Sequence, residues 1–325
     1  MLNDAVCRFH RWIVAVNPWT NVYGVARSLI AGASALTLAT NDSSALFMRA
    51  SGMAAAPRCE DLGAAGLYCL IPSLDLVRWV AIAVLLVTAS GWRPRWTAIP
   101  HWYVTWSYFA SATILDGGDQ IASILTLLMV PIALGDRRRW HWQAPATAPA
   151  HGPLATSAAL AGILLVRVQV ALVYAEAAVG KLRVDEWRNG TATYYYLLDP
   201  VFGVADWLRP AMEAVLFSAA GVIALTWGTI ALEAALFAGL IAARPYRAVL
   251  LPLGIAFHLG IALFQGLPSF SLTMVAALIL YLRPVARPFA VPVAVAARLR
   301  GALASFRRDR DPRFVTVTAR EEVGT

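Results

Sequence analysis

The residue with the clearest chemical potential is Lys181, the only lysine in a chain that also contains 26 arginines. It ends a long apolar run and directly follows Gly180. A desolvated lysine loses its proton readily whereas an arginine stays charged, so Lys181 is suited to act as a base or a nucleophile. The alternative is an interfacial lysine whose ammonium group reaches the polar boundary of a membrane and anchors a helix.

Two carboxylates occur in the tight turn Leu-Asp-Gly-Gly-Asp at residues 115 to 119, between two apolar runs. The two glycines permit a tight backbone, and Asp119 is placed to cap the helix that follows. Asp116 and Asp119 could instead bind a cation or orient Lys181. Two carboxylates alone do not supply the ligands that calcium requires.

Several other polar side chains fall inside apolar segments, where a charge at the bilayer centre costs about 2.5 kcal/mol or more. Because arginine is a poor acid or base, we expect Arg27, Arg167, Glu176 and Glu233 to form buried ion pairs that fix helix packing. His258, in the middle of another apolar segment, is expected either to make a helix-to-helix hydrogen bond or to contact a substrate.

Cys59 and Cys69 lie ten residues apart in one polar segment, whereas Cys7 is near the N-terminus. Outside the cell membrane such a pair can form a stable disulfide, which we predict here. The alternatives are two free thiols or a metal site that lacks its other ligands. The chain has no metal-ligand spacing of histidines and cysteines, no phosphate-binding glycine loop and no nucleophile elbow, so we predict no metal.

The elements that must position these residues are membrane helices. Of the 325 residues, 59% are hydrophobic and only 14% are charged, which is far from the composition of soluble domains. A membrane span needs about 20 mostly apolar residues. The sequence therefore predicts an all-α, polytopic membrane helical bundle of about eight transmembrane helices, at residues 22 to 40, 74 to 92, 98 to 115, 119 to 135, 155 to 180, 217 to 243, 248 to 266 and 268 to 282.

The basic residues predict the orientation of the chain in the membrane. With the N-terminus inside, the cytoplasmic segments hold 18 arginines and the outer segments hold 6 basic residues, as the positive-inside rule requires. Both termini are then cytoplasmic, and Lys181, the aspartate turn and Cys59 lie outside. This explains the net charge of +8 without a nucleic-acid partner. We expect a cytoplasmic segment at 1–21, a transmembrane domain at 22–283 and a basic cytoplasmic tail at 284–325.

The segment from Tyr174 to Tyr196, YAEAAVGKLRVDEWRNGTATYYY, resembles a pattern of the horizontally transferred transmembrane (HTTM) domain family, which includes the vitamin K-dependent gamma-carboxylases. The Asp-Gly-Gly-Asp turn, Trp227-Gly228-Thr229 with Glu233, and Phe257-His258 follow in the family's order. The residues around Cys59 and Cys69 are most similar to the family's sporulation-delaying protein B (SdpB) branch. The resemblance covers about residues 15 to 285.

The resemblance implies a function at the outer membrane face. Proteins of the SdpB branch are associated with a small secreted precursor peptide and a partner protein encoded nearby, which implies maturation or export of an antimicrobial peptide toxin at the plasma membrane. The lysine of the carboxylases' Lys-Leu motif, the base in their vitamin K chemistry, matches Lys181. The chain lacks the carboxylases' large luminal domain and has Asp119 where they have a histidine.

On this basis we expect a catalytic group of Lys181, Asp119, Asp116 and Glu176, with substrate contacts from Trp187, Tyr174 and His258. Two alternatives come from other classes of protein. One is an enzyme that uses membrane lipid or a membrane quinone as its cofactor. The other is a non-catalytic scaffold or immunity-like partner, in which the charges within the membrane only hold helices together.

Overall fold

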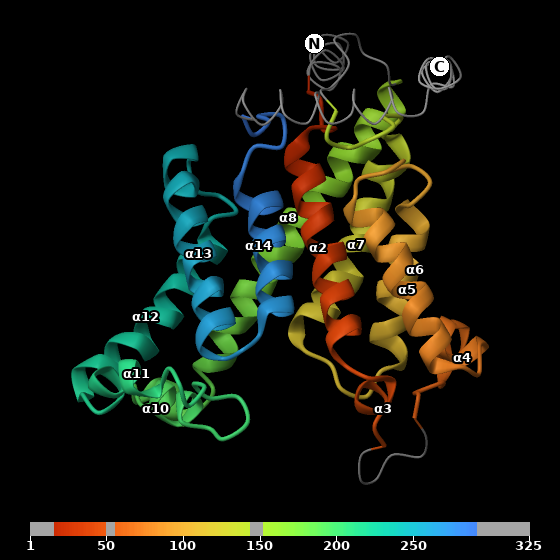
Figure 1. Cartoon of the computed structure of the whole chain (residues 1–325). Helices are drawn as coiled ribbons and strands as arrows, with labels where there is room; N and C mark the ends of the chain where they lie inside the picture. Colours follow the sequence, from red (N-terminus) through yellow and green to blue (C-terminus); the bar gives the residue numbers. More distant parts are fainter. Residues whose placement is uncertain (1–15, 50–55, 144–151, 291–325) are drawn as a thin grey trace, which may run out of the picture. The chain divides into compact units, whose positions relative to one another are not determined.

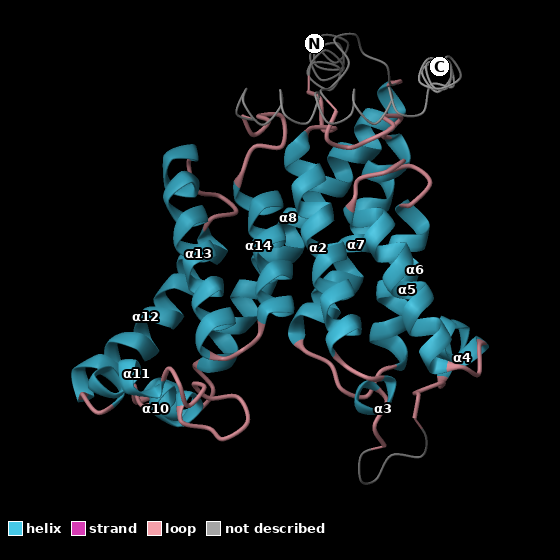
Figure 2. Ribbon diagram, viewed as in Figure 1, coloured by secondary structure: helices cyan, strands magenta, loops and turns pink. Residues whose placement is uncertain are grey.

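The structure is a computed structural model that describes residues 16–49, 56–143 and 152–290. These residues form helices and loops and contain no strand (Figures 1 and 2). The all-α prediction is confirmed. The eight longest helices in the described residues are α2 (Asn21–Thr40), α5 (Leu74–Ala89), α6 (Ala98–Ser111), α7 (Gly117–Gly135), α8 (Pro153–Lys181), α12 (Ala219–Ala238), α13 (Arg244–Phe264) and α14 (Pro268–Leu282).

Each range predicted to span the membrane overlaps one of these helices. Five of them, α2, α7, α8, α12 and α13, are long and apolar enough to cross a bilayer, and α14 is a shorter apolar helix. The total number of crossings and the orientation of the chain stay predictions, as do the domain limits. Residues 1–15 and 291–325, where most of both predicted cytoplasmic segments fall, lie outside the described residues.

The long helices alternate in direction, so the bundle has two ends (Figure 1). We call the end at which α8 finishes and α7 begins the lysine end, because it holds Lys181 and the aspartate turn. The opposite end, where α7 and α14 finish, is the arginine end. The shorter helices of the lysine end are α3 (Ser43–Leu46), η1 (Asp61–Ala65), α4 (Leu67–Leu70), α9 (Asp185–Arg188), α10 (Ala192–Leu197) and α11 (Arg209–Leu216).

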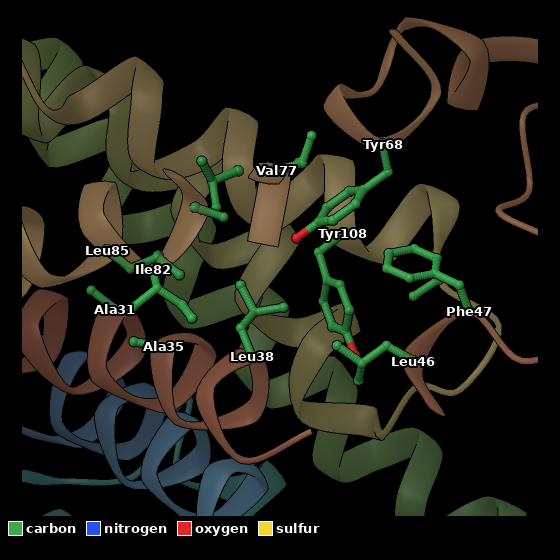
Figure 3. Close-up of a cluster of buried hydrophobic side chains, with 13 residues drawn as sticks. Ala31, Ala35, Leu38, Leu46, Phe47, Tyr68, Val77, Ile82, Leu85 and Tyr108 are labelled. Atoms are coloured by element: carbon green, nitrogen blue, oxygen red, sulfur yellow. The ribbon is translucent and has the colours of Figure 1, made fainter. Parts of the chain in front are cut away.

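The packing is centred on α2, which contacts both α14 and α5, while α7 packs against α6 and α8. A buried apolar cluster joins α2 to α5, α6 and the short helices α3 and α4 (Figure 3). Within it, Tyr68 of α4 lies 4.7 Å from Phe47 and 6.3 Å from Tyr108, measured between ring centroids. The segment with η1 and α4 is therefore fixed to the bundle by aromatic contacts.

Cys59 and Cys69 form a disulfide, as the sequence predicted. The bridge closes a loop that carries η1 and most of α4, and hydrogen bonds join this loop to α6. Arg58 N donates a hydrogen bond to Ser111 O at 2.9 Å, and Tyr103 Oη donates one to Ala65 O at 2.7 Å. The disulfide and these bonds hold the same short segment at the lysine end.

Replacing both Cys59 and Cys69 with serine is expected to lower the free energy of unfolding by about 2 to 3 kcal/mol, because the unfolded chain loses a short closed loop. The measurement is thermal unfolding in detergent, with and without a thiol reductant. Reductant should destabilise the wild-type protein and leave the double variant unchanged. Cys7→Ser keeps the bridge and is the matched control. Equal melting temperatures for wild type and the double variant would contradict a stabilising role.

Candidate functional site

Lys181 forms an ion pair with Glu233 at the lysine end. The distance from Lys181 Nζ to Glu233 Oε1 is 2.6 Å, and the Lys181 side chain is 22% exposed. Glu233 is only 5% exposed, and its Oε2 atom is buried without a hydrogen-bond partner among the described residues. The lysine thus pairs with one oxygen of a buried carboxylate, and the other oxygen makes no hydrogen bond with the described residues.

The pair forms where α12 crosses α8. Lys181 is the last residue of α8, whereas Glu233 lies 14 residues after the start of α12 at Ala219. At a rise of 1.5 Å per residue that is about 21 Å along α12. The first part of α12 therefore extends past the end of α8, and Figure 1 shows it sloping away from the bundle toward α10 and α11.

A second polar pair lies within the same helices. Tyr174, two turns before Lys181 on α8, makes a buried hydrogen bond of 2.9 Å between its Oη and His258 Nε2 of α13. The His258 ring also contacts Phe270 of α14, with ring centroids 5.6 Å apart. Of the two roles expected for His258, the geometry shows the helix-to-helix hydrogen bond.

Trp187 covers the ammonium group of Lys181. The Lys181 Nζ atom lies 5.1 Å from the centroid of the Trp187 ring, within the range of a cation–π contact. The Trp187 ring also contacts Tyr196, with ring centroids 5.8 Å apart. Of the three residues expected to bind substrate, Trp187 is the one placed directly on Lys181.

The two aspartates of the tight turn cap α7. Asp119 N donates to Asp116 Oδ1 at 3.0 Å, and Asp116 N donates to Asp119 Oδ2 at 3.1 Å, which is a reciprocal capping box. Ser269 Oγ also donates to Asp116 Oδ2 at 3.4 Å. The structure therefore connects the aspartates to the N-terminus of α14. The carboxylate that pairs with Lys181 is that of Glu233 and not that of either aspartate.

Glu176 faces away from Lys181. It is exposed on α8, five residues before the lysine, a spacing that puts two side chains on different faces of a helix. The structure does not bring Glu176 into the group with Lys181, although the sequence analysis placed it there. Of the four residues expected in that group, only Lys181 takes part in the ion pair. Its partner, Glu233, was not among the four.

The structure gives Arg27 and Arg167 other partners than the expected ion pairs with Glu176 and Glu233. Arg27 donates from Nη2 to Thr97 Oγ1 at 2.8 Å, and Arg167 reaches the carbonyl oxygens of Leu280 and Arg283 at 3.5 and 3.4 Å. Neither forms an ion pair with a carboxylate in residues 16–49, 56–143 or 152–290. Arg167 is 14 residues, or about 21 Å, from Lys181 along α8, so it cannot reach the glutamate that the lysine holds.

A cavity of about 320 Å³ lies at the lysine end, between α10 and the start of α12. Its lining includes the aromatic side chains of Tyr194, Tyr195 and Phe217. Gly190, also in the lining, has a positive φ of 84° and would bring an added Cβ within 3.3 Å of Trp227 Nε1. The residues that line the cavity begin directly after α9, which carries Trp187, and their aromatic rings suit an apolar ligand.

An all-helical bundle with five helices able to cross a bilayer and a charged pair at one end has the features of a multi-pass membrane protein. The chain is 40% identical over 276 residues to the protein YitO of Bacillus subtilis (strain 168), which is 83% of this chain and 87% of YitO. It is 34% identical over 279 residues to the sporulation-delaying protein SdpB of the same strain, which is 84% of each chain. The chain therefore belongs to the SdpB family, and it is a multi-pass protein of the plasma membrane.

No family model matches the chain, and no solved structure matches it. The SdpB branch of the resemblance is thus supported, whereas the wider HTTM and carboxylase relationship stays a hypothesis. The partner of Lys181 could not be read from the sequence, because Glu233 is 52 residues away. The available signal was that each residue is an isolated charge in or at the end of an apolar helix.

Proposed function

We propose that this protein acts in the maturation or export of a small secreted peptide toxin, with its site at the lysine end on the outer side of the membrane. The support is twofold. The chain is 34% identical to a protein named for delaying sporulation, and the structure holds an ion pair and, at the same end of the bundle, an aromatic cavity. A precursor peptide and a partner protein encoded nearby belong to this proposal.

The observation that carries the proposal is the 2.6 Å contact between Lys181 Nζ and Glu233 Oε1. An ammonium group cannot act as a base until it has lost a proton. Glu233 is placed to accept that proton, which leaves Lys181 as a neutral amine. The amine can then take a proton from a peptide substrate, which restores the ammonium group, and the carboxylic acid of Glu233 can give its proton to the group that leaves the substrate, which restores the carboxylate.

The surroundings of the pair suit a peptide substrate. Trp187 shields one side of the lysine, while the 22% exposure of the side chain leaves it open to a ligand. The cavity lined by Tyr194, Tyr195 and Phe217 offers an apolar side chain a partly enclosed binding place. The buried Tyr174–His258 hydrogen bond joins α8 to α13 and holds the helix that carries Lys181.

The test is Lys181→Arg, scored as mature extracellular peptide when the full-length protein is co-expressed with its precursor and partner protein. Arginine keeps the positive charge next to Glu233 but cannot act as a base. We expect peptide production to be lost while the variant still inserts into the membrane. Arg183→Lys is the matched control, since this exposed residue keeps its charge on the same segment; its peptide yield should equal that of wild type.

Unchanged peptide production by Lys181→Arg would show that the lysine needs only its charge, and the catalytic role would be wrong. Unchanged production by Lys181→Ala as well would favour the non-catalytic scaffold. Both results use the same strain and the same peptide measurement. The experiment thus separates base chemistry, charge and scaffold roles of one side chain.

A further inference from the structure

A second cavity lies at the arginine end. It has a volume of about 520 Å³, and five arginines from three separate parts of the chain line it. They are Arg167 of α8, Arg244 and Arg247 of α13, and Arg283 and Arg287, which follow α14. The aliphatic side chains of Leu251 and Leu282 complete much of the wall. The helices of the bundle have thus gathered positive charges from distant sequence positions around one space.

Carboxylates of the described residues do not pair with four of the five arginines that line this cavity. In the part of the chain that the structure describes, Arg167, Arg244, Arg247 and Arg287 form no ion pair with an acidic side chain. Arg247 donates to Ala242 O at 2.9 Å and to Leu240 O at 3.1 Å. The carbonyl oxygens after a helix carry only partial negative charge, so they offset part of the repulsion between the guanidinium groups.

Arginines at this end also have a simpler explanation, because basic residues accumulate on the cytoplasmic side of membrane proteins. That rule requires charge in a segment but does not require charges to converge. Here Arg167 comes from the middle of α8 and is half-buried, as is Arg247. A half-buried arginine at the centre of an apolar helix is costly. An anionic partner in the shared cavity would offset that cost.

We propose that this cavity binds a phosphate-bearing anion. Guanidinium groups hold phosphate oxygens through paired, charge-assisted hydrogen bonds, and five of them line one cavity here. The aliphatic wall and the position between membrane helices favour the head group of an anionic phospholipid, which such basic pockets recognise. The predicted cytoplasmic position of the arginine end would place the cavity at the anionic inner leaflet. This site is independent of the chemistry at Lys181.

The variant that tests the cavity is Arg244→Gln with Arg287→Gln. Both side chains are exposed, and neither guanidinium group donates a hydrogen bond to another described residue, so their loss leaves the helix contacts in place. The matched control is Arg95→Gln with Arg137→Gln. Those two arginines are also exposed and belong to the same end of the bundle, but they do not line the cavity. The two double variants have the same net charge.

The experiment uses the full-length protein, stripped of lipid in a neutral detergent, and measures binding of phosphatidylglycerol, phosphatidylcholine and inorganic phosphate. We expect phosphatidylglycerol to bind and to raise the melting temperature, and the cavity variant to bind it at least about tenfold more weakly, a loss of about 1.4 kcal/mol. The control variant should bind as wild type does.

Competition by inorganic phosphate at similar concentrations would identify a soluble phosphate compound as the ligand, and its failure to compete would identify the lipid head group. Either result supports a phosphate site, provided that the cavity variant loses it. Equal binding by the two double variants would overturn the proposal, since non-specific charge would then explain the effect. Equal binding of phosphatidylcholine and phosphatidylglycerol, or no binding of any probe, would also overturn it.

Discussion

Replacing Lys181 with methionine is expected to lower the free energy of unfolding by about 3 to 5 kcal/mol. The substitution leaves the Glu233 carboxylate buried with neither oxygen paired, because Oε2 already lacks a partner among the described residues. Removing one member of a buried ion pair costs more than the pair contributes, since the remaining charge has no compensation. The measurement is unfolding of the purified protein in mixed micelles, followed by loss of helical signal.

The reverse substitution, Glu233→Met, should cost less. Lys181 is 22% exposed and sits at a helix end, so its ammonium group can turn toward water when the carboxylate is absent. The double variant, with methionine at both positions, should recover most of the stability that Lys181→Met loses, because two apolar side chains leave no buried charge. Peptide production should be lost in all three variants if the pair is catalytic.

This cycle separates structure from chemistry. If the loss of unfolding free energy in the double variant equals the sum of the losses in the two single variants, Lys181 and Glu233 are not energetically coupled. The proposed stabilising ion pair would then be wrong. Arg183→Met is the matched control, because it removes an exposed charge two residues from Lys181. Its effect on the free energy of unfolding should stay within about 0.5 kcal/mol.

The sequence predicted those features of the fold that depend on local pattern. A run of apolar residues long enough for a bilayer is visible without any knowledge of its neighbours, and each such run overlaps one of the long helices. The disulfide was visible because Cys59 and Cys69 are close in the chain. The cap of α7 is likewise a contact over three residues, although the N-cap is Asp116, with Asp119 as its partner inside the helix, and not Asp119 as expected.

The partners of the buried charges could not be predicted in the same way. Tyr174 and His258 are 84 residues apart, and their contact depends on the crossing of α8 and α13 in the bundle. The sequence analysis grouped three acidic residues with Lys181, and the nearest of these three in the chain, Glu176, faces the other side of its helix. Which acid meets the lysine is decided by the tilt of α12, and no period in the sequence encodes that tilt.

Replacing Gly91 with alanine is expected to lower the free energy of unfolding by about 2 to 4 kcal/mol. Gly91 joins α5 to α6 with a φ of 87°, a left-handed conformation that costs other residues about 1 kcal/mol or more. An added Cβ would also lie 2.5 Å from the His141 ring, so the ring must move. That ring is held by Ser28 Oγ at 3.1 Å from its Nε2 atom, and His141 N donates to Gly91 O at 3.0 Å.

Thermal unfolding in detergent, compared across three variants, distinguishes the two costs at this turn. His141→Ala removes one of the two rings near the added Cβ, while Trp142 Nε1 still lies 2.7 Å from it, so adding Gly91→Ala to His141→Ala should cost less than it does in wild type but more than the backbone share of about 1 kcal/mol. Gly32→Ala is the matched control, since nothing lies within 4 Å of its added Cβ on α2. That control should leave stability unchanged or raise it, because alanine favours a helix over glycine. A loss at Gly32 as large as the loss at Gly91 would mean that neither the positive φ nor the histidine ring explains the requirement for glycine at the turn.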